Sequence, residues 1–503
     1  MRRLLFSFSL VWCAGCAAAS AGPAPTTPEA PPPASTAPPP APVLGSRDPI
    51  IPDPPASCEV FKTTSGAEPC PSSQALLAAV SEAGPEALLR FESCERFEPG
   101  LIRALVAELA PMACADLIVE SAGKIDPPPE LREVLTALGI AGRLSRLVGE
   151  PPRLAPPFDA ERFREFMRSQ LAPWLTAQSQ AISDLAKTGA GLTGYAQGVV
   201  AIQAGLADLR MVELMRGVAL PEELAGDDGL EEAYFSSLDQ ALEPRKTRGR
   251  DAALVGLRRF REQGAIEDHR LSQAHRLLST LYNGRRIDRL SGLMLPQLAK
   301  PGSATALPTY YANRLLSEDE LTTQLGAVVT RGIPTRLKER VEAPGQSSVS
   351  PAQRLEYALA VVQLGQRYVA QSEFKRAAAL AQPLASSPGR VGEIARLLRA
   401  LGTAFDGAPR DAAHLILQGL GGWQPQLSEL DRLAGGAGEV AGMAGFNAAL
   451  LRELTVPADA GADTFEALAV RYERASAKLG GELEERALAS AQAMRETAKA
   501  VTR

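Results

Sequence analysis

Apolar residues recur along the chain with the three- and four-residue spacing of a helix that buries one face. The clearest runs are Phe163, Phe166, Met167, Leu171, Trp174 and Leu175, then Leu254, Leu257 and Phe260, then Leu468, Tyr472, Ala475 and Leu479. Convincing two-residue alternation, which would indicate a half-buried strand, is absent. The pattern therefore predicts an all-α protein.

Helix start signals support this prediction. Serine or aspartate followed three residues later by Glu or Gln is typical of a helix N-terminus, and proline suits the first helical position. Such signals occur at Ser317 with Glu320, at Ser350 with Pro351 and Gln353, and at Asp463 with Glu466.

Two proline-rich breaks divide the helical part of the chain. They fall at residues 151–157 and 343–350, and clustered prolines interrupt helices. We therefore expect a small cystine-bearing helical module at 57–150, a central helical module at 158–342 and a C-terminal helical module at 350–503.

The first residues have the parts of an export signal. Arg2 and Arg3 precede an apolar run from Leu4 to Trp12, and small residues follow. A positive, an apolar and a small segment in this order are typical of a signal peptide. The apolar run is shorter than the roughly 20 residues that span a bilayer, so we expect export and not a membrane span.

The end of this signal resembles the lipobox of bacterial lipoproteins. Residues 14–16 read Ala-Gly-Cys, as in that family, whereas Cys13 stands where the family usually has Leu. The resemblance implies a signal peptide at 1–15 and a lipid on Cys16. Ala17, where Asp would mark inner-membrane retention, implies the outer membrane. Ordinary secretion with cleavage near Ala18 is the alternative.

Residues 16–56 are predicted to form a disordered tether. Fourteen prolines lie between Ala21 and Ala56, and such a stretch cannot bury enough apolar surface to fold. At about 3.1 Å per residue, an extended proline-rich chain would reach on the order of 100 Å. It would hold the helical body away from a membrane.

Four cysteines remain for disulfides if Cys13 leaves with the signal and Cys16 carries a lipid. An even number of cysteines in an exported chain predicts disulfides. The four are Cys58, Cys70, Cys94 and Cys114.

Helix geometry narrows their pairing. Residues 72–83 read as one helix, with Gly84 as its stop and Pro85 as the start of the next, which places Cys70 and Cys94 at the same end. A helix from Leu101 to Leu109 would separate Cys94 from Cys114 by ~15 Å, too far for a disulfide. We expect Cys70–Cys94 with Cys58–Cys114; the local pair Cys58–Cys70 is the alternative.

Residues 318–420 resemble degenerate tetratricopeptide repeats. Val361 stands where that family has Trp, and Ala381 where it has a large aromatic residue. The positions that match the family's spacing are Leu364, Gly365, Tyr368 and Ala377, echoed by Leu401, Gly402 and Phe405. The alternative is a set of irregular antiparallel helices packed through small residues. Either way we expect antiparallel helical hairpins in an irregular α-solenoid-like array.

Two sets of residues resemble motifs of cell-wall enzymes. Ser121 and Lys124, with Lys-Thr-Gly at 187–189, resemble the motifs of penicillin-binding proteins and serine β-lactamases. The middle motif of that family fails at residues 183–185, which lack the amide, and Lys-Thr-Gly ends a predicted helix instead of lying on a strand.

The second set is weaker. Glu120 before Ser121 resembles the acid of lytic transglycosylases, but the Gly-Leu-Met that should follow shortly lies at 292–294. A dinucleotide-type pattern at Gly436, Gly438 and Ala441 follows a charged helical segment and not an apolar strand. Close helix packing through Gly438 and Gly442 explains these glycines better. We expect no catalytic residue among them.

Charge and histidines give no indication of nucleic acid, metal or cofactor. The net charge is −5, so no global basic field favours nucleic acid. His269 and His275 lie six residues apart, about 240° around a helix, and cannot share a metal from one face. We expect surface or boundary histidines and no cofactor.

One basic cluster is a candidate site for an anionic partner. It consists of Arg245, Lys246, Arg248, Arg250 and Arg258. In an otherwise acidic protein such a patch could receive an acidic protein face or an envelope polymer. The alternative is a solvated helix face paired with nearby carboxylates, of which the closest in sequence are Glu243, Asp251 and Glu262.

We therefore expect a lipid-anchored cell-envelope protein, on the periplasmic or surface side of the outer membrane. Its helical body would be a non-enzymatic scaffold that binds another envelope protein, because helical arrays offer extended concave surfaces. This last step is an analogy from the fold. The alternative is a cell-wall hydrolase or lyase with unrecognised catalytic residues.

Overall fold

Helices account for every regular element of the described chain. The computed structural model describes residues 51–62, 69–121, 125–148, 151–154, 160–218, 220, 226, 228–266, 268–282, 287–296, 341, 349–408, 423–457 and 459–502. All of these belong to one compact unit, Arg47–Arg503. No strand occurs among the described elements, which confirms the all-α prediction. The predicted signal and residues 16–50 of the predicted tether lie outside the described residues. For residues 51–56 the prediction of a disordered tether is wrong, because Ile51 packs against the apolar core, Arg146 donates to the backbone O of Pro52 at 2.7 Å, and Ala56 begins a 3₁₀ helix.

The helices of the first group are short, apart from the last, which has 18 residues. Ser72 accepts a hydrogen bond from the backbone N of Ala75 and starts α1, and Gly84, at a φ of 87°, ends it. The stop at Gly84 and the restart at Pro85 are therefore as predicted. The elements are η1 (Ala56–Phe61), α1 (Ser73–Ala83), η2 (Pro85–Phe91), α2 (Leu101–Leu109), η3 (Met112–Cys114), α3 (Ala115–Glu120) and α4 (Pro129–Arg146).

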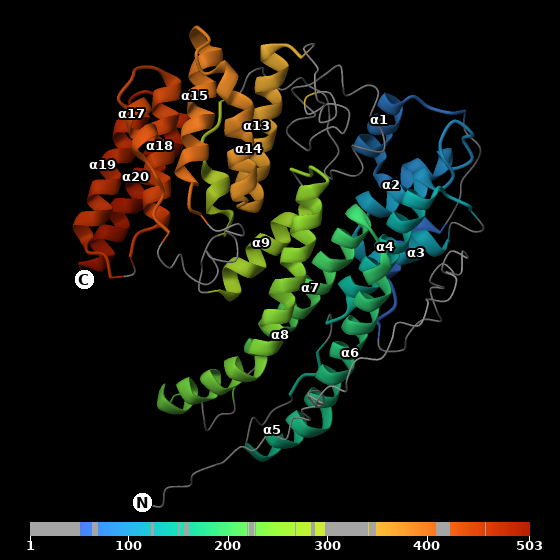
Figure 1. Ribbon diagram of the computed structural model, residues 1–503. Coiled ribbons are helices and arrows are strands. Elements are labelled where there is room, and N and C mark those ends of the chain that lie inside the picture. The colour runs from blue at the N-terminus through green and yellow to red at the C-terminus, as the bar shows by residue number, and fades with distance from the viewer. Residues whose placement is uncertain are drawn as a thin grey trace, which may run out of the picture. The chain divides into compact units, whose positions relative to one another are not determined.

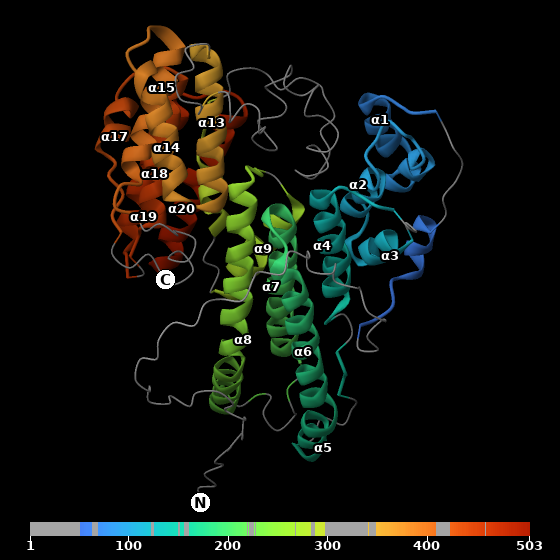
Figure 2. The same cartoon turned by 45° about the vertical axis from the view of Figure 1, so that its right-hand side comes forward.

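The next helices include the longest one. α7 packs against α4, α6, α8 and α9 (Figure 2), and α8 runs for 35 residues with Pro244 inside it. A π-helical turn interrupts the first predicted apolar run. The elements are α5 (Ala160–Phe166), the π turn η4 (Met167–Leu171), α6 (Ala172–Thr188), η5 (Gly189–Gly191), α7 (Gly194–Arg216), α8 (Asp228–Glu262), α9 (His269–Leu281) and η6 (Ile287–Gly292).

Helices α7 and α8 approach one another through glycines. A Cβ added at Gly205 would lie 2.6 Å from the backbone N of Ala253, and one at Gly256 would lie 2.7 Å from the backbone N of Ile202. The later residue on α7 faces the earlier residue on α8, so the two helices are antiparallel. Since real Cβ atoms do not come this close to backbone atoms, these positions require glycine.

The remaining helices form what we call the C-terminal array. Each described helix packs against the next one along the chain (Figure 1), which is the arrangement of an α-solenoid. The elements are α13 (Pro351–Tyr368), α14 (Gln371–Ala381), η8 (Gln382–Leu384), α15 (Gly389–Ala404), α17 (Ser428–Ala434), α18 (Glu439–Leu454), α19 (Ala462–Ser476) and α20 (Glu482–Val501).

The glycines of the tetratricopeptide-like pattern admit neighbouring helices. A Cβ at Gly365 would lie 3.0 Å from the ring of Phe374, and one at Gly402 would lie 2.4 Å from the Cβ of Ala378. The ring of Phe374 also stacks on Phe405, with 3.8 Å between centroids. These residues therefore pack α13, α14 and α15 together, whichever family the pattern belongs to.

Two helix starts test the capping predictions. The capping box at Ser350 is confirmed, because its side chain accepts from Gln353 N and Gln353 accepts from Ser350 N, both at 3.2 Å. A helix also begins where Asp463 and Glu466 predict one, at Ala462, but Asp463 is not its cap. Gly461 precedes the first helical residue without a side-chain cap, and Asp463 lies in the first turn, where its charge complements the helix dipole. Ser317 and Glu320 lie outside the described residues.

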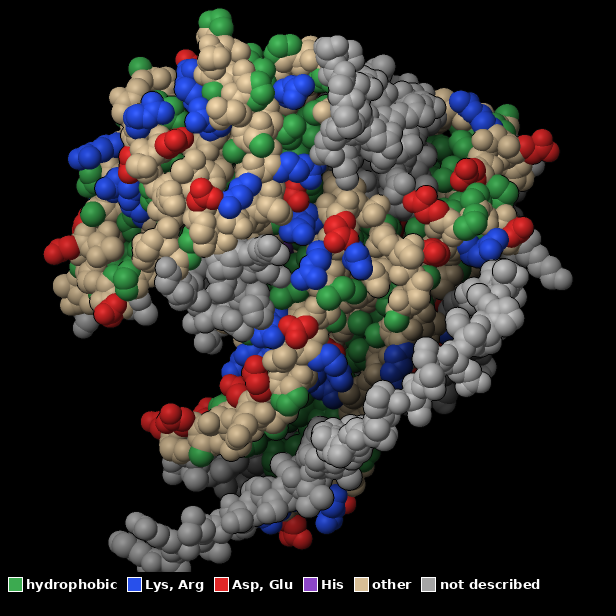
Figure 3. Space-filling model, viewed as in Figure 1, with side chains coloured by type: hydrophobic (Ala, Val, Ile, Leu, Met, Phe, Trp, Pro, Cys, Tyr) green, Lys and Arg blue, Asp and Glu red, His purple; other side chains and the backbone are tan. Residues whose placement is uncertain are grey.

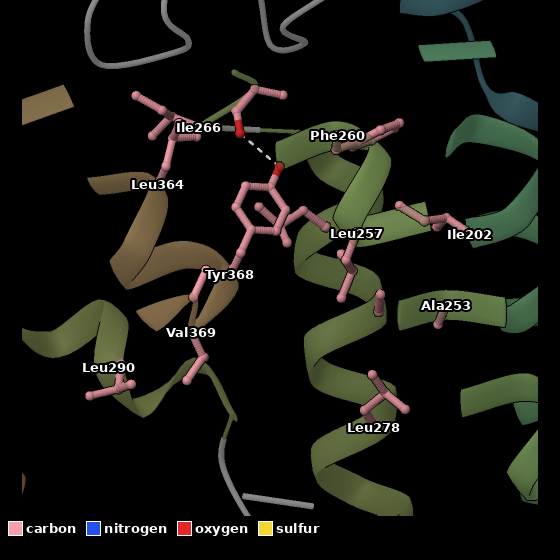
Figure 4. Packing of buried hydrophobic residues seen from close by; sticks show 14 of the residues in the cluster. Ile202, Ala253, Leu257, Phe260, Ile266, Leu278, Leu290, Leu364, Tyr368 and Val369 are labelled. Carbon is pink, nitrogen blue, oxygen red and sulfur yellow. Dashed lines mark hydrogen bonds between the residues drawn. The ribbon is translucent and has the colours of Figure 1, made fainter. Parts of the chain in front are cut away.

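The array meets the central helices at a buried tyrosine. The hydroxyl of Tyr368 donates to the backbone O of Ala265 at 2.7 Å (Figure 4). Apolar side chains surround this bond, with Ile266 from the segment after α8 and Leu364 from α13 close by in Figure 4. The described residues of the central and C-terminal modules thus share one apolar core.

Candidate functional site

The structure places the four cysteines in the two pairs that helix geometry favours. Cys58 and Cys114 are bonded, with Cα atoms 5.3 Å apart, and Cys70 and Cys94 are bonded with Cα atoms 5.2 Å apart. The first pair is fully buried, whereas Cys70 of the second is exposed. The local alternative, Cys58–Cys70, is not formed.

The basic cluster faces a buried carboxylate that the sequence analysis did not identify. Arg248 forms two hydrogen bonds of 2.6 Å to the carboxylate of Asp208 on α7, and Arg245 lies 3.3 Å from it. The side chain of Asp208 is 3% exposed. The hydrogen bonds that Arg248 donates to Asp208 raise the pKa of the Arg248 guanidinium. Two of the five predicted patch residues therefore hold α8 against α7.

The other members of the cluster have neighbours on or near α8. Lys246 lies 4.4 Å above the ring of Tyr282 and 3.7 Å from Glu243. Arg250 pairs with Asp251 at 2.9 Å, and Arg258 lies further along α8. On the face in Figure 3, Lys and Arg side chains alternate with Asp and Glu. The contacts resemble the solvated, paired helix face more than an open anionic-partner site.

The cell-wall enzyme motifs do not assemble into a site among the described residues. Ser121 accepts a hydrogen bond from Arg103 at 2.9 Å and donates to the backbone O of Ile118 at 3.0 Å. Glu120 pairs with Arg143 at 2.8 Å. Lys187 pairs with Asp184 on the exposed side of α6, and Lys124 lies outside the described residues. Each described group thus has a structural partner.

The glycine pattern near α18 has two different causes. Gly438 has a φ of 86°, and a Cβ added there would meet no atom within 4 Å. It is therefore required by the backbone conformation and not by the close packing we expected. Gly442 does pack closely, because its Cβ would lie 2.8 Å from Leu479. Among the histidines, His275 is 5% exposed and is therefore a core residue, which corrects the expectation for that position.

Four polar side chains are buried together where α2, α7 and α9 meet. Arg270 donates to both carboxylate oxygens of Glu108 at 3.0 and 2.9 Å and to the hydroxyl of Tyr195 at 2.8 Å. It also lies 3.2 Å from Asp268. The side chains of Glu108, Asp268 and Arg270 are 0% exposed, so no substrate reaches them. This is a structural network that joins residues 162 positions apart.

One cation in this network serves two carboxylates, and their pKa values diverge. Burial alone would raise the pKa of Glu108, but Arg270 lowers it below the ordinary value. Asp268 interacts less strongly with Arg270 than Glu108 does, and burial raises the pKa of Asp268 to about 6. Burial, together with the charge of Arg270, lowers the pKa of the neighbouring His269 to about 4.

A second arrangement lies at the C-terminal array and involves the segment after α9. We call residues 289–296 the strap. Asn447 of α18 accepts from the backbone N of Met294 at 2.7 Å and donates to its backbone O at 2.9 Å. Gln366 of α13 donates to the backbone O of Ser291 at 2.7 Å and of Leu293 at 3.0 Å. Side-chain amides from two helices thus bond the strap backbone.

Two charged residues complete this arrangement. Arg289 of the strap forms a bidentate pair with Glu453 of α18, at 2.6 and 2.9 Å from one nitrogen. Tyr472 of α19 donates to the same carboxylate at 2.5 Å. Arg486 of α20 donates to the backbone O of Gly292. We call Gln366, Asn447, Glu453 and Arg486 the strap socket.

Apolar side chains of the strap fill the space behind these polar contacts. Leu290, Leu293 and Met294 are at most 3% exposed, whereas Ser291, Gly292 and Leu295 are half-buried. The strap therefore lies at the surface with one side turned inward. The sequence assigned these residues to the central module, and they pack both against α9 of that module and against α13 and α18 of the C-terminal array.

Comparisons with protein-family models, with curated proteins and with solved structures each returned no match. Within the described ranges, no group of three or more His, Cys, Asp or Glu side chains is placed to hold a metal ion. None of the helices searched in the described chain combines the length and apolarity of a membrane span.

Sequence reasoning missed the polar residues that organise these sites. Asn447 and Glu108 each interrupt an apolar helical stretch, at residues 440–451 and 104–110. A single polar residue at a core position indicates a buried partner. That signal could have marked both residues, but it does not name the partner.

Proposed function

We propose that this protein is a lipid-anchored cell-envelope scaffold whose helical body binds another protein. The observation that carries the proposal is the C-terminal array, in which each described helix from α13 to α20 packs against the next described one. Arrays of this kind present extended surfaces to partners. The proposed anchor is Cys16, and the proposed location is the outer membrane.

The disulfides support export. Every described cysteine is in a disulfide, and disulfides persist in oxidising compartments such as the bacterial periplasm. The tetratricopeptide-like resemblance belongs to the same proposal, because such repeats bind proteins.

Lipidation is tested by metabolic labelling with an alkyne fatty acid. We expect label on the wild-type chain and on Cys13→Ser, and none on Cys16→Ser. Equal label on Cys16→Ser would contradict the anchor.

The scaffold role is tested by crosslinking in intact cells, followed by purification through a C-terminal tag. We expect one envelope protein in near-equal amount, and its loss with Cys16→Ser. Recovery of this chain alone would contradict the scaffold and turn attention to activity on purified cell wall.

A further inference from the structure

We propose that the strap socket is a peptide-binding site, occupied here by the chain's own strap, and that a partner docks by placing a similar segment in it. The segment would carry a basic residue followed by apolar residues one, four and five positions later, as Arg289, Leu290, Leu293 and Met294 do. This inference rests on the proposed scaffold function and names the partner's chemistry.

The socket side chains contact the strap mainly through its backbone. Gln366, Asn447 and Arg486 bond backbone atoms of the strap and not its side chains. Backbone groups are the same in every peptide, so these side chains would bond any segment that follows the same path. Main-chain bonds of this kind supply affinity in peptide recognition, and side-chain pockets supply specificity.

Specificity comes from one charge and three buried positions. Glu453, whose side chain is 16% exposed, takes Arg289 in a bidentate pair. Such a pair selects arginine by geometry as well as charge. The buried places of Leu290, Leu293 and Met294 would reject polar side chains, because burial without a partner is unfavourable.

The strap competes with a partner because it belongs to the same chain. A tethered segment has an effective concentration on the order of millimolar. A partner segment therefore binds the wild-type chain more weakly than its intrinsic affinity for the socket, by the fraction of time the socket is open. Weakening the strap should raise the affinity for a peptide in trans.

The experiment measures binding of a fluorescein-labelled peptide of residues 287–297 to the full chain. The fluorescence anisotropy of the peptide reports the binding. We expect Leu293→Ala with Met294→Ala to bind this peptide at least tenfold more tightly than the wild-type chain. Adding Asn447→Ala should reverse the gain at least tenfold. A peptide with Arg289 replaced by Glu should bind no better to the variant than to the wild type.

Folding is followed in the same samples by helical circular dichroism. If the double variant is loosened, the peptide should raise its Tm with increasing concentration and a scrambled peptide should not. Neither binding nor a Tm increase at up to ~1 mM peptide, the range in which the tethered strap itself acts, would overturn the proposal.

Failure of this inference differs from failure of the scaffold role. A partner recovered from cells equally well by Asn447→Ala and by the wild-type chain would exclude the socket and leave the scaffold intact. Peptide binding by the socket without any partner in cells would do the reverse.

Discussion

The carboxylates of Asp208 and Glu108 are almost completely buried, and each forms an ion pair with an arginine. An unpaired buried charge is strongly destabilising, whereas a paired and hydrogen-bonded one is tolerated. Their partners come from 40 and 162 positions away. At the residue scale, such pairs fix which helices can lie together.

Replacing Asp208 should therefore weaken the contact between α7 and α8. In Asp208→Asn, Arg245 and Arg248 lose their shared anion, and because Arg248 is 48% exposed water recovers part of the loss. We expect the free energy of unfolding in urea to fall by ~1–3 kcal/mol. The matched control is Asp251→Asn, an exposed partner of Arg250, which should change it by less than about 0.5 kcal/mol.

Asp268 and His269 should give opposite contributions to stability as pH falls. The pKa of Asp268 is raised to about 6, so the folded protein binds a proton there before the unfolded chain does, and stability rises through that pH. The pKa of His269 is lowered to about 4, so the unfolded chain binds this proton first. The free energy of unfolding therefore decreases as the pH falls below about 6.5, the ordinary pKa of histidine. The two slopes oppose one another in the overlapping range.

Single substitutions should separate these slopes. Between about pH 6.5 and 4.5, His269→Asn should become more stable as the pH falls, and Asp268→Asn should become less stable. The wild-type chain should change less than either variant. Urea unfolding at several pH values measures this, and three parallel profiles would contradict the assignment.

At the scale of elements, α7 and α8 pack closely through glycines. Gly205 and Gly256 lie opposite backbone atoms of the facing helix, so the helices pack closer than side chains would allow. A glycine in a helix costs roughly 1 kcal/mol relative to alanine. The close contact must offset that loss through packing.

Gly205→Ala should therefore destabilise the protein despite alanine's better helix propensity. The added Cβ meets backbone atoms that cannot rotate away, and overpacking of this kind costs about 1–3 kcal/mol. Gly217→Ala at the end of α7 is the control, because its nearest neighbour would lie 3.5 Å away. Urea midpoints compare the two, and an unchanged midpoint for Gly205→Ala would mean that the helices separate easily.

At the scale of the whole described molecule, contacts distant in sequence connect its parts. Arg270 joins α9 to α2, Tyr368 joins α13 to the end of α8, and the strap joins α9 to the C-terminal array. The first disulfide acts over the same range, since it links residues 56 positions apart, against 24 for the second.

The two disulfides should therefore contribute unequally to stability. Closing the longer loop removes more entropy from the unfolded chain, by about 0.7 kcal/mol on the chain-entropy relation, and Cys58–Cys114 is also the buried pair. We expect Cys58→Ser with Cys114→Ser to lose at least that much more unfolding free energy than Cys70→Ser with Cys94→Ser. Equal losses in urea unfolding would contradict this.

Local sequence patterns were enough to predict the helical class, the capping box at Ser350, the stop at Gly84 and the two cysteine pairs that are found. These follow from periodicity, local hydrogen bonds and helix rise, which depend on residues close in the chain. Export and lipidation stay predictions from the first residues.

The partners of the buried polar side chains follow only from the tertiary packing. In the sequence, Arg248 is a candidate surface cation, but α7 places the buried Asp208 beside it. Residues 289–296 were assigned to the central helical module, but side chains of α13, α18 and α20 bond their backbone. The physical reason is that a buried polar group is satisfied by whichever partner the packing brings near. The sequence neighbours of Arg248 and of residues 289–296 do not specify these partners.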